Sequence, residues 1–175
     1  MKTRNLTRIP AIDKASSCIN IVVETPKTSR GKFKYDDDLG AFLLHKVLPL
    51  GFAFPYDFGF IPSTKGEDGD PLDVLLLLDV PVITGTIVKA RLIGVIEAEQ
   101  REKDGVSVRN DRLLAIAVHT NEDAPMVDIS QLPESTLNEV EAFFSDYDRQ
   151  QGKEFRSLRR RGAKTAMRVV KASFR

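Results

Sequence analysis

Cysteine is nearly absent from this chain of 175 residues, because Cys18 is the only one. A lone cysteine excludes an internal disulfide and fits a reducing compartment. Long apolar runs are lacking too. The stretch from Val74 to Leu78 is far too short to span a bilayer, and no apolar segment of a signal peptide follows Met1 to Arg4. These absences predict a cytoplasmic protein that has no membrane partner.

An excess of charge of one sign is also missing. The 26 Lys and Arg residues balance 25 Asp and Glu residues, so the net charge is +1 and nothing attracts the whole molecule to nucleic acid or membrane. A basic C-terminal segment keeps nucleic acid open as an alternative partner: Arg156, Arg159, Arg160, Arg161, Arg168, Lys171 and Arg175. The chain lacks the interleaved aromatic residues of a base-stacking surface, however, so a nucleic-acid partner is not expected.

Recognisable cofactor motifs are absent as well. The sequence has no Gly-rich phosphate loop, no dinucleotide fingerprint and no internal repeat. Neither His45 nor His119 has a partner at metal-site or nucleophile spacing, so structural roles are expected for both. The length predicts one domain, residues 1–175, that is large enough to bury its own core.

Strand-like segments fill the first two thirds of the chain, separated by Gly, Pro, Asp or Ser as in a small barrel. The expected strands are Ile19–Glu24, Lys32–Tyr35, Phe42–Val47, Phe58–Pro62, Leu72–Leu78, Gly85–Glu97 and Arg112–Thr120. A helix is expected after Pro133, with Ser135 as its N-cap, because four apolar residues follow at helical spacing: Leu137, Val140, Phe144 and Tyr147. A second helical stripe contains Ala163, Ala166, Met167, Val170 and Phe174.

Three carboxylates lie within six positions just before an apolar run: Asp68, Asp70 and Asp73. Carboxylates this close repel one another unless a cation, a proton or bulk water relieves them. Gly69 and Pro71 bend and stiffen the backbone between them. Because Mg²⁺ requires oxygen ligands in strict geometry, the cluster is a candidate metal site, with a solvated acidic turn as the alternative. An EF-hand loop is excluded, since its sixth position counted from Asp68 is Asp73 rather than glycine.

This cluster resembles the signature of the soluble (family I) inorganic pyrophosphatases: an aspartate, a small residue, Asp-Pro, an apolar residue and Asp. The resemblance runs in order from about Ile19 to Phe174. It rests on four further segments: Val22–Pro26, Gly31–Asp36, Phe54–Ile61 and Phe143–Tyr147. It implies a mainly β fold, a distorted five-stranded OB-like β-barrel with flanking α-helices. It also implies a homo-oligomer, with a hexamer as the candidate assembly.

The resemblance further implies hydrolysis of inorganic pyrophosphate to two phosphates with Mg²⁺, for which Mn²⁺ or Zn²⁺ are possible substitutes. The metal ions would neutralise phosphoryl charge and lower the pKa of the attacking water. Asp68 and Asp73 would be metal ligands, Asp70 would bind metal and activate the water, and Glu24 would orient metal-bound water. The residues in contact with the phosphates would be Lys32, Lys46, Arg112 and Tyr147.

Several positions depart from the family pattern. Lys34 stands where the family has a glutamate, and Lys46 where it has an arginine, so a point charge replaces a bidentate fork. Phe54 and Phe58 replace two tyrosines and lose their hydroxyl donors. Asp148 stands in place of a lysine.

The loop before Arg112 is longer than in the family and rewritten. Two metal-binding aspartates and a lysine of the family align with Gln100, Asn110 and Arg112. Register across an insertion is open, and five acids lie nearby that could supply the missing ligand: Glu97, Glu99, Glu102, Asp104 and Asp111. Of these we expect Asp111 to do so. The alternative to an active enzyme is a weakened or inactive relative that binds phosphate, a nucleotide or a partner protein.

Overall fold

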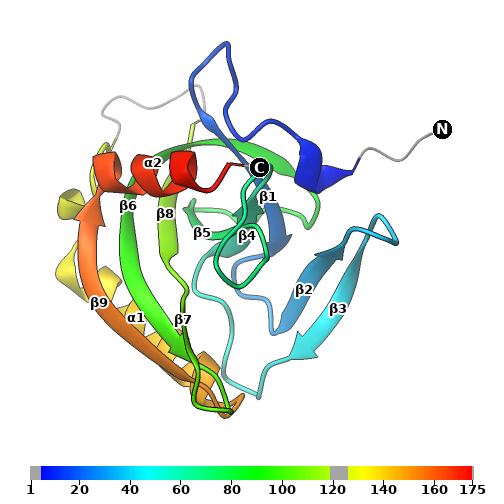
Figure 1. Ribbon diagram of the computed structural model, residues 1–175, viewed down its shortest axis with the longest axis vertical. Coiled ribbons are helices and arrows are strands. Elements are labelled where there is room, and N and C mark those ends of the chain that lie inside the picture. Colours follow the sequence, from blue (N-terminus) through cyan, green and yellow to red (C-terminus); the bar gives the residue numbers. More distant parts are fainter. Residues whose placement is uncertain (1–4, 119–125, 175) are drawn as a thin grey trace.

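The computed structural model describes residues 5–118 and 126–174. It is mainly β, with two α-helices late in the chain (Figure 1). The strands are β1 (Ile19–Thr25), β2 (Gly31–Asp36), β3 (Ala41–Val47), β4 (Asp57–Ile61), β5 (Leu72–Leu77), β6 (Ile87–Arg101), β7 (Ser107–Arg109), β8 (Arg112–Ala117) and β9 (Glu154–Gly162). The helices are α1 (Glu134–Arg149) and α2 (Ala163–Ala172), and 3₁₀ turns cover Leu6–Arg8 and Ile129–Gln131.

Five strands form a closed ring in the order β1–β4–β5–β8–β6, and β6 pairs again with β1. All pairings in the ring are antiparallel except β5 with β8. One apolar cluster, which includes Val23, Val74 and Leu113, packs with residues of α2. A second cluster joins Leu75, Ile96 and Leu114 to the apolar face of α1. The predicted mainly β, five-stranded OB-like architecture with flanking helices is confirmed.

The strand β6 is the longest, at 15 residues, and extends beyond the ring. Its C-terminal part pairs with β7 on one side and β9 on the other. The hairpin β2–β3 forms a separate two-stranded sheet that stands beside the ring (Figure 1). The hairpin, the ring and α1 together surround the cavity described below.

Several local predictions were wrong. The helix α1 has Pro133 rather than Ser135 as its N-cap, and no side chain caps it. Phe174 is not part of α2, because that helix ends at Ala172; it forms an isolated bridge with Thr64 instead. Two strands were not predicted, the short β7 and the arginine-rich β9. The calls on His119, Thr120 and Arg175 lie outside the described residues.

The C-terminal end of the chain supports the loop that carries the acidic cluster. The bridge between Thr64 and Phe174 is flanked by a hydrogen bond of 2.8 Å from the backbone N–H of Lys65 to the carbonyl of Ser173. The buried hydroxyl of Thr64 also accepts from the N–H of Leu72 at 3.0 Å. The loop between β4 and β5 is therefore fixed at its base from both sides.

Candidate active site

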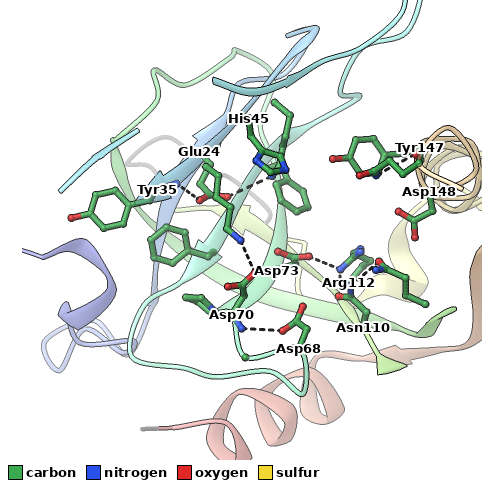
Figure 2. A pocket seen from close by; sticks show the side chains of 18 of the residues that line it. Glu24, Tyr35, His45, Asp68, Asp70, Asp73, Asn110, Arg112, Tyr147 and Asp148 are labelled. Carbon is green, nitrogen blue, oxygen red and sulfur yellow. Dashed lines mark hydrogen bonds and ion pairs between the residues drawn. The ribbon is translucent and has the colours of Figure 1, made fainter. Parts of the chain in front are cut away.

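A cavity of about 630 Å³ lies between the β2–β3 hairpin, the ring and α1. Figure 2 shows that carboxylates, basic groups and aromatic rings converge on it from all three parts. The residues that line it are Thr7, Glu24, Lys32, Lys34, Tyr35, Asp36, Asp37, Asp38, His45, Phe54, Phe58, Phe60, Asp68, Gly69, Asp70, Pro71, Asp73, Gln100, Glu102, Asn110, Arg112, Phe144, Tyr147, Asp148, Gln151 and Lys153.

The three clustered aspartates line one side of this cavity. Asp68 and Asp70 lie in the loop before β5, and Asp73 lies near the start of that strand. The backbone N–H of Asp70 donates to Oδ1 of Asp68 at 3.1 Å, which closes a tight turn around Gly69 at φ +90°. Glycine adopts this left-handed conformation readily. Burial raises the pKa of Asp68, and the nearby charges of Asp73 and Asp70 raise it further.

Two basic side chains contact the cluster. Nζ of Lys34 lies 2.7 Å from Oδ2 of Asp70, and both side chains are about half exposed. Nη1 of Arg112 donates to Oδ2 of Asp73 at 2.5 Å and also to Oδ1 of Asn110. Arg112 is buried, unlike Lys34. Part of the negative charge of the cluster is thus balanced by the chain itself.

Glu24 reaches the cavity because of an irregularity in β1. The pairing of β1 with β4 shifts register between Val23 and Thr25, and such a bulge redirects the side chain within it. The strands approach closely here, since a Cβ at Gly59 would lie 2.1 Å from the carbonyl oxygen of Val22. Oε1 of Glu24 accepts from the backbone N–H of Tyr35 at 2.8 Å. The carboxylate is therefore held from β1 and β2 together.

Lys32 is the buried cation beside Glu24. Its Nζ lies 3.5 Å from Oε2 of Glu24 and 3.7 Å from the ring centroid of Phe58. Burial lowers the pKa of Lys32 and raises that of Glu24, and the attraction between the two charges opposes both shifts. The aromatic ring of Phe58 thus supports the lysine.

Tyr147 and Asp148 face the cavity from the end of α1 (Figure 2). Burial raises the pKa of Tyr147 to about 12, so its hydroxyl remains a proton donor at neutral pH. Asp148 is 1% exposed, burial raises the pKa of its carboxyl, and its Oδ2 has no hydrogen-bond partner among residues 5–118 and 126–174. Lys46 does not line the cavity; its buried Nζ lies 5.0 Å from the ring centroid of Tyr147, and no described residue forms a hydrogen bond with it.

The rewritten loop brings Gln100 and Asn110 into the cavity, where their side chains share a hydrogen bond of 3.0 Å. Asp111 does not line this cavity. Its Oδ1 accepts from the N–H of Ala98 at 3.0 Å and from Nε of Arg109 at 2.5 Å. Asp111 borders a neighbouring cavity of about 370 Å³, which Asp68 and Asp73 also line.

Sequence reasoning missed several residues that line the cavity, among them His45 and Lys153, whereas Glu102 was one of the acids left open as a ligand near the rewritten loop. His45 was expected to be structural, yet it faces the cavity from β3 (Figure 2). Glu102 and Lys153 form an ion pair of 2.9 Å, and they come from β6–β7 and from the residue before β9. No sequence motif pointed to this pair, because β9 itself was not predicted.

Comparisons with known proteins identify the family. Residues 21–175 match the family model described as inorganic pyrophosphatase. The chain is 36% identical over 171 residues to the inorganic pyrophosphatase of Thermus thermophilus, which covers 96% of this chain and 95% of that protein. It is 37% identical over 160 residues to soluble inorganic pyrophosphatase 2 of Chlamydomonas reinhardtii, over 91% of this chain and 80% of that one.

Solved structures agree with this result. The crystal structure of the Thermus thermophilus inorganic pyrophosphatase superposes with a TM-score of 0.85 at 34% identity and covers 97% of both chains. The structure of an inorganic pyrophosphatase from Neisseria gonorrhoeae gives a TM-score of 0.83 at 32% identity over 94% of both chains. The fold and the acidic site define a hydrolase of the phosphate-metabolism class. The chain belongs to the inorganic pyrophosphatase family.

Membership of this family implies a divalent metal cofactor, and the donor chemistry of the acidic cluster fits one. Burial, and after it the nearby charges of Asp73 and Asp70, raise the pKa of Asp68, and a cation would relieve the repulsion between these carboxylates. Among residues 5–118 and 126–174, however, no three acidic, His or Cys side chains converge into a ready ligand set. Lys34 contacts one oxygen of Asp70, and Arg112 contacts one oxygen of Asp73. Neither helix in the described residues is long and apolar enough to cross a bilayer.

Proposed function

We propose that this chain hydrolyses inorganic pyrophosphate to two phosphates with Mg²⁺, in the cytoplasm, as one domain of residues 1–175. The observation that carries the proposal is the meeting of three clustered aspartates with buried basic groups in one cavity. Acidic groups are suited to holding a divalent cation, and basic groups are suited to holding the oxygens of a highly charged anion. The family assignment supports the same reaction.

Asp68, Asp70 and Asp73 would hold the metal. When bound, a divalent ion supplies positive charge for the phosphoryl oxygens and acidifies water. Mn²⁺ and Zn²⁺ are candidate substitutes, since they also accept carboxylate oxygens. Lys34 would release Asp70 when a metal ion binds, because an ion pair this exposed contributes little free energy. Asp111 would join as a ligand only if Arg109 released it.

The phosphate oxygens would be held by Lys32, Arg112 and Tyr147, which all line the cavity. Each hydrogen bond to a charged phosphate contributes about 1.5–3 kcal/mol. Lys46 would join this set only after its Nζ turns from the Tyr147 ring. Among these four residues, only Arg112 has a planar guanidinium that can form two parallel hydrogen bonds to a phosphate.

Asp70 would accept the proton of the attacking water, because it lies at the mouth of the cavity and its present partner, Lys34, is exposed. Glu24 would orient that water from its fixed place beside Tyr35. Both residues then act on the nucleophile, and the basic groups act on the substrate.

Phosphate release from pyrophosphate tests this function. Purified protein should release phosphate with Mg²⁺ and should stop when EDTA is added. Asp70→Asn should abolish turnover and keep the fold, because it removes the proton acceptor. Asp146→Asn is the matched control, since Asp146 lies on α1, pairs with exposed Arg149 and does not line the cavity. The function is refuted if no phosphate appears with Mg²⁺, Mn²⁺ or Zn²⁺.

We further propose that the chain forms a homo-oligomer, with a hexamer as the first candidate. Exposed apolar side chains on and after β3 support this assembly: Leu43, Leu44, Val47 and Leu50. Such patches on soluble proteins often mark interfaces. Light scattering on the eluting protein measures the mass, and a monomer at micromolar concentration would contradict the proposal.

A further inference from the structure

Arg112 occupies one side of the acidic cluster. Its Nη1 donates to the carboxylate of Asp73 at 2.5 Å and to the amide oxygen of Asn110. Figure 2 shows the guanidinium between these two side chains. Both acceptors are oxygen donors of the kind that a divalent ion takes. In this chain a guanidinium already fills the space between them.

The position of Arg112 is fixed by burial and packing. Its side chain is 4% exposed, and Cζ lies 4.6 Å from the ring centroid of Phe144 and 5.9 Å from that of Phe155. A guanidinium stacks favourably on aromatic rings and does not lose its charge in proteins. Its positive charge is therefore permanent, whatever the pH or the metal supply.

Lys34 provides the contrast. It also pairs with a carboxylate of the cluster, Asp70, at 2.7 Å, but the two side chains are 47% and 53% exposed. A flexible, hydrated lysine at such a site is easily displaced by an incoming cation. A divalent ion can thus take over Asp70 from Lys34, whereas Arg112 would have to be pulled out of its packing to release Asp73.

We propose that Arg112 is a built-in cation that takes the place of one divalent ion, so that the substrate-free protein loads metal only on the Asp68–Asp70 side of the cluster. The inference rests on the proposed role of that cluster as the metal site. Asp73 then contributes only the oxygen that Arg112 does not take. Asn110 fits this arrangement, because a neutral amide suffices opposite a single positive charge, where a divalent ion would favour a carboxylate.

Mn²⁺ binding to the metal-free protein tests this without turnover. The electron paramagnetic resonance signal of free Mn²⁺ is followed during titration, with no phosphate or pyrophosphate present. Arg112→Gln removes the charge and keeps a polar side chain. The variant should bind one more Mn²⁺ per chain than the unmodified protein, or it should bind Mn²⁺ with an affinity that is higher by a factor of about ten or more.

Arg160→Gln is the matched control. Arg160 also pairs with two carboxylates, Glu134 at 2.5 Å and Glu141 at 2.8 Å, and does not line the cavity. Its removal frees acidic groups elsewhere and should leave Mn²⁺ binding unchanged. A gain of Mn²⁺ in this control equal to that in Arg112→Gln would overturn the inference, because any freed carboxylate would then suffice.

The variant Asn110→Asp keeps Arg112, so it tests the inference even if Arg112→Gln does not fold. The new carboxylate should pair with Arg112, and the number of bound ions should stay the same. An extra ion in this variant would overturn the inference, as would unchanged stoichiometry and affinity in a folded Arg112→Gln protein. If neither the unmodified protein nor any variant binds Mn²⁺, the inference and the proposed metal site both fail. If only the effect of Arg112→Gln is missing, the metal site stands and the inference alone fails.

Discussion

Lys32 is the buried cation whose loss should be most visible in the stability of the protein. Its side chain and that of Glu24 are 10% and 8% exposed, and Nζ lies 3.5 Å from the carboxylate. Lys32→Met keeps the bulk of the side chain but leaves Glu24 buried without its cation. Removing one partner of a buried ion pair costs about 3–5 kcal/mol. The lost contact with the Phe58 ring, 3.7 Å from Nζ, adds about 0.5–2 kcal/mol.

A combined loss of about 3.5–7 kcal/mol is a large part of the roughly 5–15 kcal/mol that stabilises a typical protein. For a chain of this size it corresponds to a fall in Tm of roughly 7–28 °C. Thermal and urea unfolding should be measured in EDTA, so that metal binding does not contribute. Adding Glu24→Gln to Lys32→Met removes the stranded charge, so the double variant should be more stable than Lys32→Met alone by about 2 kcal/mol.

The stability deficit of Lys32→Met should depend on pH in a defined direction. Burial already raises the pKa of Glu24, and loss of Lys32 should raise it further. A carboxyl with a raised folded pKa contributes stability that is present below its unfolded pKa and is lost as the pH rises through the folded value. The deficit of Lys32→Met should therefore grow as the pH rises above about 4.3, the ordinary pKa of a glutamate, and that of the double variant should not. A Tm within about 2 °C of the parent protein, or a double variant no more stable than Lys32→Met, would refute the reasoning.

Three further outcomes are expected. Phe58→Tyr should lower the KM for pyrophosphate about ten- to hundredfold, because a hydroxyl donor to phosphate contributes about 1.5–3 kcal/mol; an unchanged KM in a folded variant would contradict this. Asp111→Asn should lower the Tm and leave the Mg²⁺ dependence unchanged, because the carboxylate holds Arg109; a sharply raised Mg²⁺ requirement would instead identify Asp111 as a ligand. Asp128→Ala should cost about 1 kcal/mol in unfolding experiments near neutral pH, because Asp128 accepts from the N–H groups of Ser130 and Ala163. These hydrogen bonds lower its pKa, so the cost should vanish as the pH falls through that lowered value; a cost that persists in acid would argue against the capping role.

The sequence revealed those parts of the site that lie close together along the chain. Asp68, Asp70 and Asp73 stand in one short segment, so their meeting requires only a local turn and the start of β5. Glu24 and Lys32 were found through the family resemblance, and the structure brings both into the cavity.

Other parts depended on pairings that no local pattern encodes. The strand β9 has one buried residue, Phe155, so it lacks the alternation that predicts a strand. The place of Asp111 depends on the β6–β7 pairing of Glu99 with Arg109, which carries Asn110 into the cavity and leaves Asp111 outside it. The contact of Lys34 with Asp70 joins residues 36 positions apart. Such contacts follow from the assembled fold.

The support of the acidic loop by the C-terminal end bears on how the protein is made. Ser173 and Phe174 contact the base of the loop at Lys65 and Thr64, so residues synthesised well after the loop and after β9 complete it. A nascent chain can close most of the ring while it still lacks this support. The acidic site should therefore mature only after the C-terminal segment has left the ribosome. A nascent polypeptide that stalls before Ser173 would form the ring, but its acidic loop would be loosely held.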